Sequence, residues 1–402
     1  MENRLSAAIV FLPREGASPS VMLEDILFDP AARWLSESLR RAGVCRFLVA
    51  CHQEDRAGAE ACFPEGTRIV TTGGEDASGA LEEFLKENAG RVAVVTQPVY
   101  LDTAAQERLA QGRTDLTAQE RGEFVRQGAE IKGCGVFELT QEGREAILGG
   151  AELSNALAAH GREYRGLGPS CRVTREGLLG PLQGAARMET VLRLQAGGVQ
   201  MVDPMAVYAG PQVEVGRGTV LLPGVILRGE TVIGENCQIG PNSLVRDSQI
   251  GRGVTVNSSQ VNESVIEDDT TVGPFAYVRP NTHVGPGCRV GDFVELKNST
   301  IGAGTKISHL TYVGDSDVGS HINFGCGTVT VNYDGSKKFR TKIGDGAFIG
   351  CNANLVAPVE IGEGAYIAAG STITKDVPAD SLAIARSLQT VKNQWAKKRR
   401  GK

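Results

Sequence analysis

Aromatic residues make up only 5% of this 402-residue chain. No window contains the roughly 18 apolar residues that a membrane-spanning helix needs. Residues 1–5 are not followed by an apolar stretch and a small-residue cleavage site. The net charge is −5, so there is no global basic field to hold nucleic acid or an anionic membrane. We therefore expect a cytoplasmic protein that binds neither.

Cysteine pairs are also missing. The nine cysteines are scattered from Cys45 to Cys351 and include no Cys-x-x-Cys pair. Zinc sites and dithiol redox centres usually show such a pair, so neither kind of centre is visible. We interpret the cysteines as reduced thiols and expect no bound metal ion.

The most informative feature present is a six-residue repeat. An aliphatic residue recurs at every sixth position from Val215 to Val245, and again over 272–290 and 343–373. This period fits neither a helix nor an amphipathic strand and is typical of a parallel β-helix. If three hexads close one triangular coil, every sixth side chain points inward and stacks on its equivalent in the next coil. The 51 glycines suit the sharp corners of such coils.

The part of the chain before residue 190 has a different pattern. Short apolar segments at 6–11, 45–51 and 91–97 are predicted to be buried strands, and 31–42 and 80–88 are predicted to be helices. This alternation indicates an α/β domain with a mostly parallel sheet.

We expect four regions: an α/β domain at 1–190, a linker at 191–198, a β-helix at 199–389 and a basic tail at 390–402. The tail carries Trp395 and a run of four basic residues. We interpret it as a solvated terminus, with contact to an anionic ligand as the alternative.

The repeat is interrupted between Phe324 and Ile343 by a polar, turn-rich stretch that contains Asn332, Tyr333 and two adjacent lysines. Loops on a rigid scaffold are common places for binding groups. His309, one of only five histidines, comes shortly before this stretch. We expect a loop to leave the coil here and His309 to lie near the same stack of coils.

Several short motifs in this region follow one another in a recognisable order. They are Arg279-Pro280, Gly291-Asp-Phe-Val-Glu-Leu-Lys297, His309-Leu-Thr-Tyr-Val-Gly-Asp315, Asn323, Asn332-Tyr-Asp-Gly335, Leu355-Val-Ala-Pro358, Ile367-Ala-Ala-Gly370 and Ile384-Ala-Arg386. In order and spacing, the stretch from about Gly198 to Gln389 resembles the acetyltransferase half of the bifunctional N-acetylglucosamine-1-phosphate uridyltransferase/glucosamine-1-phosphate acetyltransferase family. The resemblance implies a left-handed β-helix, a homotrimer with active sites between neighbouring subunits, and acetyl-coenzyme A as donor.

Transfer of an acetyl group to a sugar amine needs a base that removes a proton as the nitrogen attacks the thioester. Histidine has a pKa near working pH, and His309 is our candidate for this base. By resemblance, Glu295 orients the imidazole and stabilises its charged form.

The resemblance also assigns residues to the two substrates. A sugar phosphate is well matched by cationic and hydrogen-bonding groups. The residues at the family's acceptor positions are Arg279, Lys297, Tyr312, Asn323 and Lys338. Those at the acetyl-coenzyme A positions are Cys326, Asn332, Tyr333, Cys351, Ala369 and Arg386.

Two of these positions depart from the family's commonest pattern. Cys326 stands where alanine is expected, and Cys351 stands where serine is expected. A cysteine beside a thioester raises the alternative of an acetyl-cysteine intermediate. The sequence shows no basic partner to form the thiolate, so we prefer direct transfer.

The N-terminal domain resembles the family least. The family's nucleotide cradle is a glycine-rich Leu-x-x-Gly-x-Gly-Thr-x-Met stretch, whereas residues 11–22 contain one glycine. Its Mg²⁺-binding Asp is replaced by Thr96-Gln97, and its later Gly-x-Asn by Gly184-Ala-Ala-Arg187. Asp102 is an alternative metal ligand, and Gln183 and Arg187 are alternative nucleotide contacts.

We therefore expect an α/β nucleotidyltransferase-like (Rossmann-like) domain followed by a left-handed parallel β-helix of hexapeptide repeats. The first domain has lost uridyltransferase activity in this interpretation, so Mg²⁺ is needed only if that activity is retained. The leading hypothesis is an enzyme that acetylates glucosamine 1-phosphate on the route to UDP-N-acetylglucosamine and the bacterial cell envelope. The alternatives are the full bifunctional enzyme, an acyltransferase for another amino sugar phosphate, and a non-enzymatic scaffold.

Overall fold

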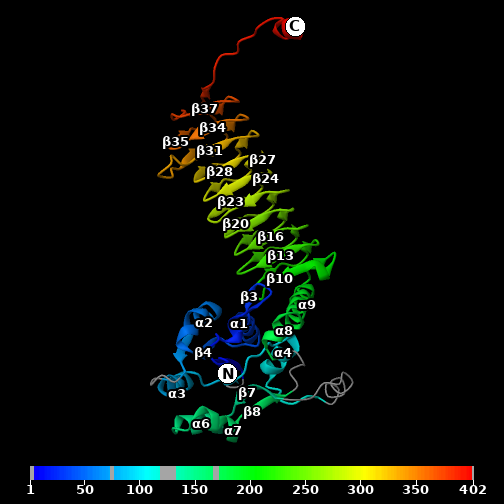
Figure 1. Cartoon of the computed structure of the whole chain (residues 1–402), viewed down its shortest axis with the longest axis vertical. Coiled ribbons are helices and arrows are strands. Elements are labelled where there is room, and N and C mark those ends of the chain that lie inside the picture. The colour runs from blue at the N-terminus through cyan, green and yellow to red at the C-terminus, as the bar shows by residue number, and fades with distance from the viewer. Residues whose placement is uncertain (1–3, 73–76, 118–132, 166–171, 401–402) are drawn as a thin grey trace. The chain divides into compact units, whose positions relative to one another are not determined.

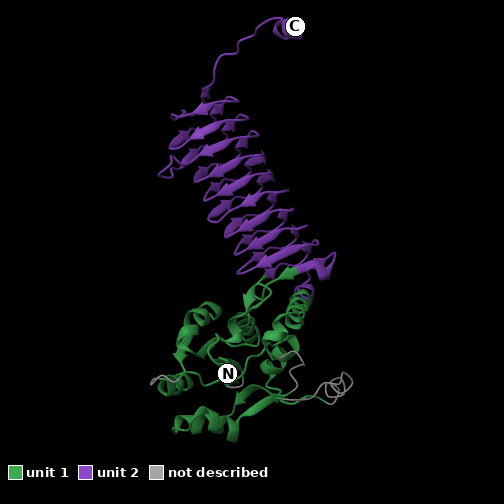
Figure 2. Cartoon of the chain, in the orientation of Figure 1, with its two compact units in different colours: residues 1–193, 208–213 green, residues 194–207, 214–402 purple. Residues whose placement is uncertain are grey.

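The computed structural model describes residues 4–72, 77–117, 133–165 and 172–400. It contains two compact units, residues 1–193 with 208–213 and residues 194–207 with 214–402 (Figure 2). Helix α9 (Pro181–Ala196) occupies most of the expected linker. Residues 208–213, expected in the β-helix, group with the first unit. In the described ranges, no helix has both the length and the apolar character of a membrane span.

The first unit contains a six-stranded mixed sheet in the order β5-β4-β1-β6-β7-β8. Strands β1 (Leu5–Leu12), β4 (Arg46–Cys51), β5 (Arg68–Thr71) and β6 (Arg91–Val95) are parallel, which confirms the three predicted strands. Strands β7 (Gly133–Leu139) and β8 (Arg162–Arg165) extend the sheet in antiparallel fashion. The sheet is therefore mixed, with its parallel part where the sequence predicts it.

Helices account for much of the rest of this unit. The predicted helices at 31–42 and 80–88 correspond to α1 (Ala31–Arg41) and α3 (Ala77–Glu87). The remaining elements are β2 (Asp25–Ile26), β3 (Asp29–Pro30), α2 (Arg56–Cys62), α4 (Thr103–Gln111), α6 (Gln141–Leu148), α7 (Leu153–His160) and α8 (Arg175–Leu178).

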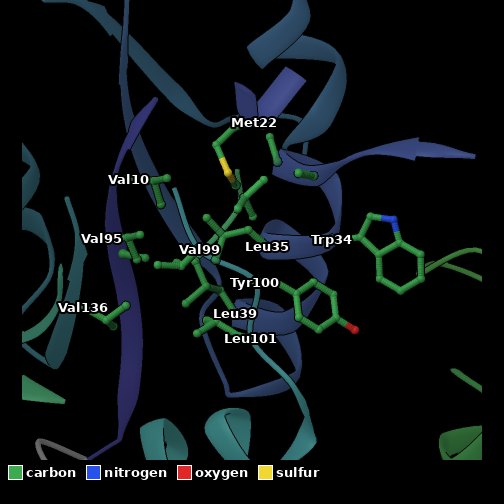
Figure 3. Packing of buried hydrophobic residues seen from close by; sticks show 14 of the residues in the cluster. Val10, Met22, Trp34, Leu35, Leu39, Val95, Val99, Tyr100, Leu101 and Val136 are labelled. Carbon is green, nitrogen blue, oxygen red and sulfur yellow. The ribbon is translucent and has the colours of Figure 1, made fainter. Parts of the chain in front are cut away.

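Both faces of this sheet are buried, as expected for strands that are apolar along their whole length. On one face, Val10 and Val95 pack with Leu35 and Leu39 of α1 (Figure 3). Trp34 is part of the same core and donates its indole N–H to the Ile26 carbonyl at 2.9 Å. The other face has its own core, built from strands β1, β4, β6 and β7 and helices α3, α6 and α7. The first unit therefore has its own hydrophobic core.

The second unit consists of three parallel sheets whose strands alternate along the chain (Figure 1). Sheet I contains β13 (Val225–Arg228), β16 (Leu244–Arg246), β19 (Gln260–Asn262), β22 (Tyr277–Val278), β25 (Glu295–Lys297), β28 (Tyr312–Gly314), β31 (Val329–Val331), β34 (Asn354–Val356) and β37 (Thr372–Ile373). Strand β10 (Val207–Ala209) lies at the boundary between the two units.

Sheet II contains β11 (Glu214–Val215), β14 (Val232–Ile233), β17 (Gln249–Ile250), β20 (Ser264–Ile266), β23 (Thr282–Val284), β26 (Thr300–Ile301), β29 (Ser316–Val318), β32 (Thr341–Ile343) and β35 (Val359–Ile361). Sheet III contains β9 (Gln200–Met201), β12 (Val220–Leu221), β15 (Gln238–Ile239), β18 (Thr255–Val256), β21 (Thr271–Val272), β24 (Arg289–Asp292), β27 (Lys306–His309), β30 (Asn323–Phe324), β33 (Phe348–Ile349), β36 (Tyr366–Ile367) and β38 (Leu382–Ala383). The tail ends in the short helix α10 (Trp395–Arg400).

The six-residue repeat forms the inner column that the sequence predicts. Leu221, Leu227 and Ile239 are completely buried, and only Val215, at the start of the column, is partly exposed. Each strand pairs in parallel with the equivalent strand one coil further along the chain. The architecture is that of a hexapeptide β-helix, consistent with the expected left-handed winding.

The coils vary in length, and this variation determines which surface residues meet. Val232 lies opposite Gln249 and Gln249 opposite Val265, so some coils are shorter than three full hexads. Asn323 lies opposite Phe348, because the expected loop around residues 332–340 lengthens this coil.

Candidate active site

His309 is the last residue of β27, and Asp292 is the last residue of the neighbouring strand β24. The two residues are in direct register, and His309 Nδ1 lies 2.6 Å from Asp292 Oδ1. The hydrogen bond from His309 lowers the pKa of the Asp292 carboxyl group, which is therefore ionised near neutral pH. An ionised carboxylate only accepts hydrogen bonds, so the Nδ1 atom carries the proton and Nε2 has a free lone pair. This tautomer suits a general base.

The close stacking of the coils at this position depends on glycine. A Cβ atom on Gly291 would lie 1.9 Å from the Ser308 carbonyl oxygen of the next coil. Any larger residue would push the two coils apart and separate Asp292 from His309. Both side chains remain accessible, with 38% of the Asp292 side chain and 54% of the His309 side chain exposed.

Within the single chain, Glu295 is not paired with His309, so its expected role stays a prediction. Glu295 accepts a hydrogen bond at 2.7 Å from Arg279 Nη1 instead. The physical reason is the register, because Glu295 lies in sheet I opposite Tyr277 and Tyr312, whereas His309 lies in sheet III. Asp292 takes the orienting position.

The expected acceptor residues lie largely on the outer face of sheet I. Side chains alternate across a strand, so Glu295 and Lys297 both point outward while Leu296 is buried. Arg279 reaches the same face one coil earlier, and Tyr312 reaches it one coil later. A Cβ atom on Gly314 would lie 2.3 Å from the Tyr312 hydroxyl, so this glycine makes room for the ring.

The loop after β31 adds a second ammonium group. Lys338 lies beside Lys297, and the hydrogen-bonding contact with Lys297, followed by its positive charge, lowers the pKa of Lys338. Asn332, at the base of the loop, donates from Nδ2 to the Tyr312 hydroxyl at 3.3 Å and to Asp315. Two adjacent cations repel each other, and an anionic group bound between them would relieve that repulsion.

The expected donor residues form a column on successive coils. Phe324 lies opposite Ile349, and Ile349 lies opposite Ile367, which brings Cys326, Cys351 and Ala369 into line two residues further on. The Cys326 carbonyl accepts from Asn352 N–H at 2.8 Å, and the Cys351 carbonyl accepts from Gly370 N–H at 2.8 Å. Three of the six predicted donor contacts therefore share one edge of the β-helix.

The other expected residues are placed as follows. Asn323 points outward on sheet III, opposite Lys306 and Phe348. The Arg386 side chain lies next to Gly370, where an added Cβ atom would be 3.7 Å from its Cδ atom. Tyr333 is in the loop, and its hydroxyl donates to the Gly335 carbonyl at 2.6 Å.

The N-terminal candidates for nucleotide or metal binding have structural partners. Gln183 bonds the Leu27 amide and the carbonyls of Asp25 and Leu178. Asp102 caps helix α4 by accepting from Ala105 N–H at 2.8 Å, and its burial raises its pKa. In the described ranges, no group of three or more His, Cys, Asp or Glu residues could hold a metal ion.

Arg187 and Thr96 have partners inside the first unit as well. The Arg187 guanidinium lies 5.3 Å from the centre of the Tyr208 ring, and Nη1 contacts the Tyr208 hydroxyl at 3.3 Å. The Thr96 hydroxyl donates to the Gly135 carbonyl at 2.9 Å.

Sequence reasoning missed Asp292, although a signal was present. Val290 and Ile307 are equivalent core positions, and Asp292 and His309 each follow two residues later. Aligning successive coils by their buried core residues, instead of following the motif along the chain, would have paired Asp292 with His309. Asp315 was missed for the same reason, since its contacts come from Asn298 and Asn332 on the coils before and after it.

Three segments, residues 212–247, 263–298 and 340–375, match the model of the bacterial transferase hexapeptide (six repeats) family. The matched segments agree with the hexapeptide β-helix that the three parallel sheets of the second unit form.

More specific relatives carry the name Bifunctional protein GlmU. That of Geobacillus sp. (strain WCH70) is 54% identical over 198 residues, which are 49% of this chain and 43% of that protein. Those of Clostridium acetobutylicum and Clostridium beijerinckii are 55% and 56% identical over 202 residues, which are 50% of this chain and 44% of each relative. The resemblance inferred from the motifs is confirmed over about half of this chain, and the chain spans less than half the length of these relatives.

Proposed function

We propose that the β-helix unit transfers the acetyl group of acetyl-coenzyme A to the amine of glucosamine 1-phosphate, with His309 as general base. The amine nitrogen attacks the thioester carbonyl, the carbon–sulfur bond breaks, and the proton that leaves nitrogen is taken by His309 Nε2. Coenzyme A leaves as its thiolate, and the proton taken up by His309 then converts this thiolate to the thiol. Asp292 acts through His309, because it holds the tautomer in which Nε2 is free.

The observation that carries this proposal is the His309–Asp292 pair together with the cationic groups around the next corner of the coil. Only two residues separate His309 from Tyr312, which begins the acceptor face with Lys297 and Arg279. A scaffold needs neither a base with a fixed tautomer nor two adjacent ammonium groups. The high identity to the GlmU proteins favours this acceptor over another amino sugar phosphate.

The proposal includes a homotrimer, and an exposed apolar column supports it. Phe275, Phe293 and Leu310 occupy the corners of three successive coils, and each is more than half exposed. The rings of Phe275 and Phe293 are stacked, with centroids 5.5 Å apart. Phe293 follows Asp292 and Leu310 follows His309, so a second copy that covers this column would reach the base.

For the first unit, we propose a nucleotidyltransferase-like domain without uridyltransferase activity. Residues 13–20 lack the glycine-rich cradle, and Arg14 in this stretch is engaged by Asp55, with Nη2 at 2.7 Å from Oδ1. The carboxylate expected after β6 is absent from the sequence, which has Thr96-Gln97 there. The bifunctional reading remains the alternative because of the names of the relatives.

One assay of the full chain tests these proposals. We expect release of coenzyme A thiol from acetyl-coenzyme A with glucosamine 1-phosphate, a much slower release with unphosphorylated glucosamine, and no pyrophosphate after addition of UTP and Mg²⁺. Equal thiol release with both sugars would exclude the phosphate site, and no release with either would exclude the acetyltransferase. Pyrophosphate formation would show that the uridyltransferase is retained.

The Lys297→Ala variant should raise KM for glucosamine 1-phosphate about tenfold to thirtyfold, with a smaller effect on KM for acetyl-coenzyme A. This corresponds to the loss of one charge-assisted hydrogen bond, about 1.5–2 kcal/mol. Initial rates at varied concentrations of each substrate separate the two constants. Lys375→Ala removes another exposed lysine of the β-helix and should change neither. A larger effect on the donor would contradict the assignment of Lys297 to phosphate.

A further inference from the structure

Cys326 and Cys351 are neighbours in space although 24 residues lie between them in the sequence. Two hydrogen bonds bracket the pair. Gly325 N–H donates to the Ile349 carbonyl at 2.7 Å, and Asn352 N–H donates to the Cys326 carbonyl at 2.8 Å. The two residues occupy equivalent turns, each two residues after the paired positions Phe324 and Ile349, and neighbouring chain segments in parallel β-structure lie about 4.8 Å apart. Disulfides use Cα separations of about 4.4–6.8 Å.

The coils approach each other closely around the two thiols. A Cβ atom on Gly325 would lie 2.4 Å from the Cys351 nitrogen, and one on Gly327 would lie 2.2 Å from Asn352 Oδ1. The glycines on both sides of Cys326 therefore keep the two corners close together.

Both thiols can be reached from solvent. Cys351 is exposed and Cys326 is partly exposed, and both are free cysteines. Five other described cysteines, Cys51, Cys62, Cys134, Cys237 and Cys288, are buried, and burial raises the pKa of the thiols of Cys51, Cys62, Cys237 and Cys288. A soluble oxidant therefore meets Cys326 and Cys351 more readily than it meets these five.

The local surroundings add a basic group that the sequence does not reveal. The Leu310 carbonyl accepts from Gly327 N–H at 3.1 Å, so the corner that follows His309 is stacked on the corner that carries Cys326. The expectation that these thiols have no basic neighbour thus changes, because His309 lies one coil away from Cys326.

We propose that Cys326 and Cys351 form an oxidisable thiol pair whose intrachain disulfide closes the donor site. This inference rests on the proposed function only for its effect on acetyl transfer. With hydrogen peroxide as oxidant, the two thiols lose two hydrogens, one sulfur–sulfur bond forms, and one peroxide is reduced to two waters. A thiol reductant reverses the reaction.

The geometry suits a reversible bond. The Cα–Cβ bonds of stacked residues are roughly parallel, so their Cβ atoms are about as far apart as the coils. A disulfide needs the two Cβ atoms about 3.8 Å apart, so each coil must shift by a few tenths of an ångström. Such strain makes a disulfide easier to reduce and is typical of regulatory bonds. The shift would occur in the column that also contains Ala369, where the donor is expected to bind.

The test is peptide mapping of the full chain after treatment with hydrogen peroxide. Trypsin places Cys326 in residues 307–337 and Cys351 in residues 343–375, each as the only cysteine of its peptide. We expect a non-reduced digest to contain these two peptides joined, two hydrogens lighter than their sum. Acetyl transfer should fall at least about tenfold in the same sample, which corresponds to about 1.4 kcal/mol, and recover with dithiothreitol.

Three variants make the result specific. Cys326→Ala and Cys351→Ser should each abolish the joined peptide, and the rate that each variant shows before peroxide should be the same after it, whereas Cys45→Ser, which removes an exposed thiol of the first unit, should behave like the parent. Absence of the joined peptide, or a bond between two chains on a non-reducing gel, would overturn the thiol pair. A joined peptide with undiminished acetyl transfer would overturn its effect on the donor site. Since peptide mapping needs no activity, failure of the proposed function is distinguishable from failure of this proposal.

Discussion

Replacing His309 with alanine should lower kcat for acetyl transfer at least about a hundredfold and leave the fold intact. The loss follows from removal of the proposed base, whose Nδ1 atom is held by the ionised Asp292 carboxylate and whose Nε2 atom would take the proton of the attacking amine. More than half of the side chain is exposed, so little packing is lost. Steady-state rates of thiol release, with circular dichroism spectra of both proteins, check the prediction.

The chain offers a matched control for this variant. His283, on β23, also pairs with a carboxylate of the preceding coil, since its Nε2 atom lies 2.5 Å from Glu267 Oε1. It lies on sheet II, away from the acceptor face, and is similarly exposed. The His283→Ala variant should therefore retain the full rate. If both histidine variants lose activity equally, the loss comes from disturbance of the coil structure, and His309 is not the base.

Asp292 should matter less than His309, because it touches the base and not the substrate. In the Asp292→Asn variant the amide still bonds Nδ1 but can stabilise the wrong tautomer by donating to it. We expect a loss of about tenfold in kcat, with KM for both substrates nearly unchanged. A raised KM for one substrate with an unchanged kcat would mean that Asp292 contacts that substrate directly.

The hexapeptide pattern was sufficient to predict the β-helix, because its inner column depends on local spacing alone. Leu221, Ile239 and Leu355 are buried where the repeat places them. Pairing across the surface was less predictable, since it depends on coil lengths that vary with each corner. Thus Glu295 was assigned to His309 from the motif, whereas the register gives His309 to Asp292 and Glu295 to Arg279.

The first unit shows the same limit in another form. Its parallel strands were predictable because they are continuous apolar runs, as in β1 and β4. Strand β8 is polar, with Tyr164 as its only buried residue, and nothing local marks it as part of the sheet. Its place depends on a contact distant in sequence, in which the Tyr164 hydroxyl donates to Glu138 at 2.7 Å.

The Phe293→Asp variant should dissociate the proposed trimer and reduce acetyl transfer at least about a hundredfold at dilute enzyme concentration, since truncation of a central aromatic anchor often costs 2 kcal/mol or more at each interface. In a symmetric trimer the substitution acts at three equivalent interfaces. Sedimentation velocity should show the mass of one chain for the variant and of three chains for the parent. The Val232→Asp variant, at a partly exposed position on sheet II, should remain a trimer.

The backbone at this column is the reason to expect a large effect. Phe275, Phe293 and Leu310 have φ values of 58°, 56° and 42°, a left-handed conformation that costs a bulky residue about 1–2 kcal/mol. Asparagine or glycine would adopt the same left-handed backbone conformation with less strain and without exposing a large apolar side chain. These three exposed side chains contribute little to the stability of an isolated chain. A neighbouring subunit that covers them would bury their apolar surface beside Asp292 and His309. A trimeric Phe293→Asp variant would show that this column faces solvent, and a monomeric variant with full activity would place the whole active site within one chain.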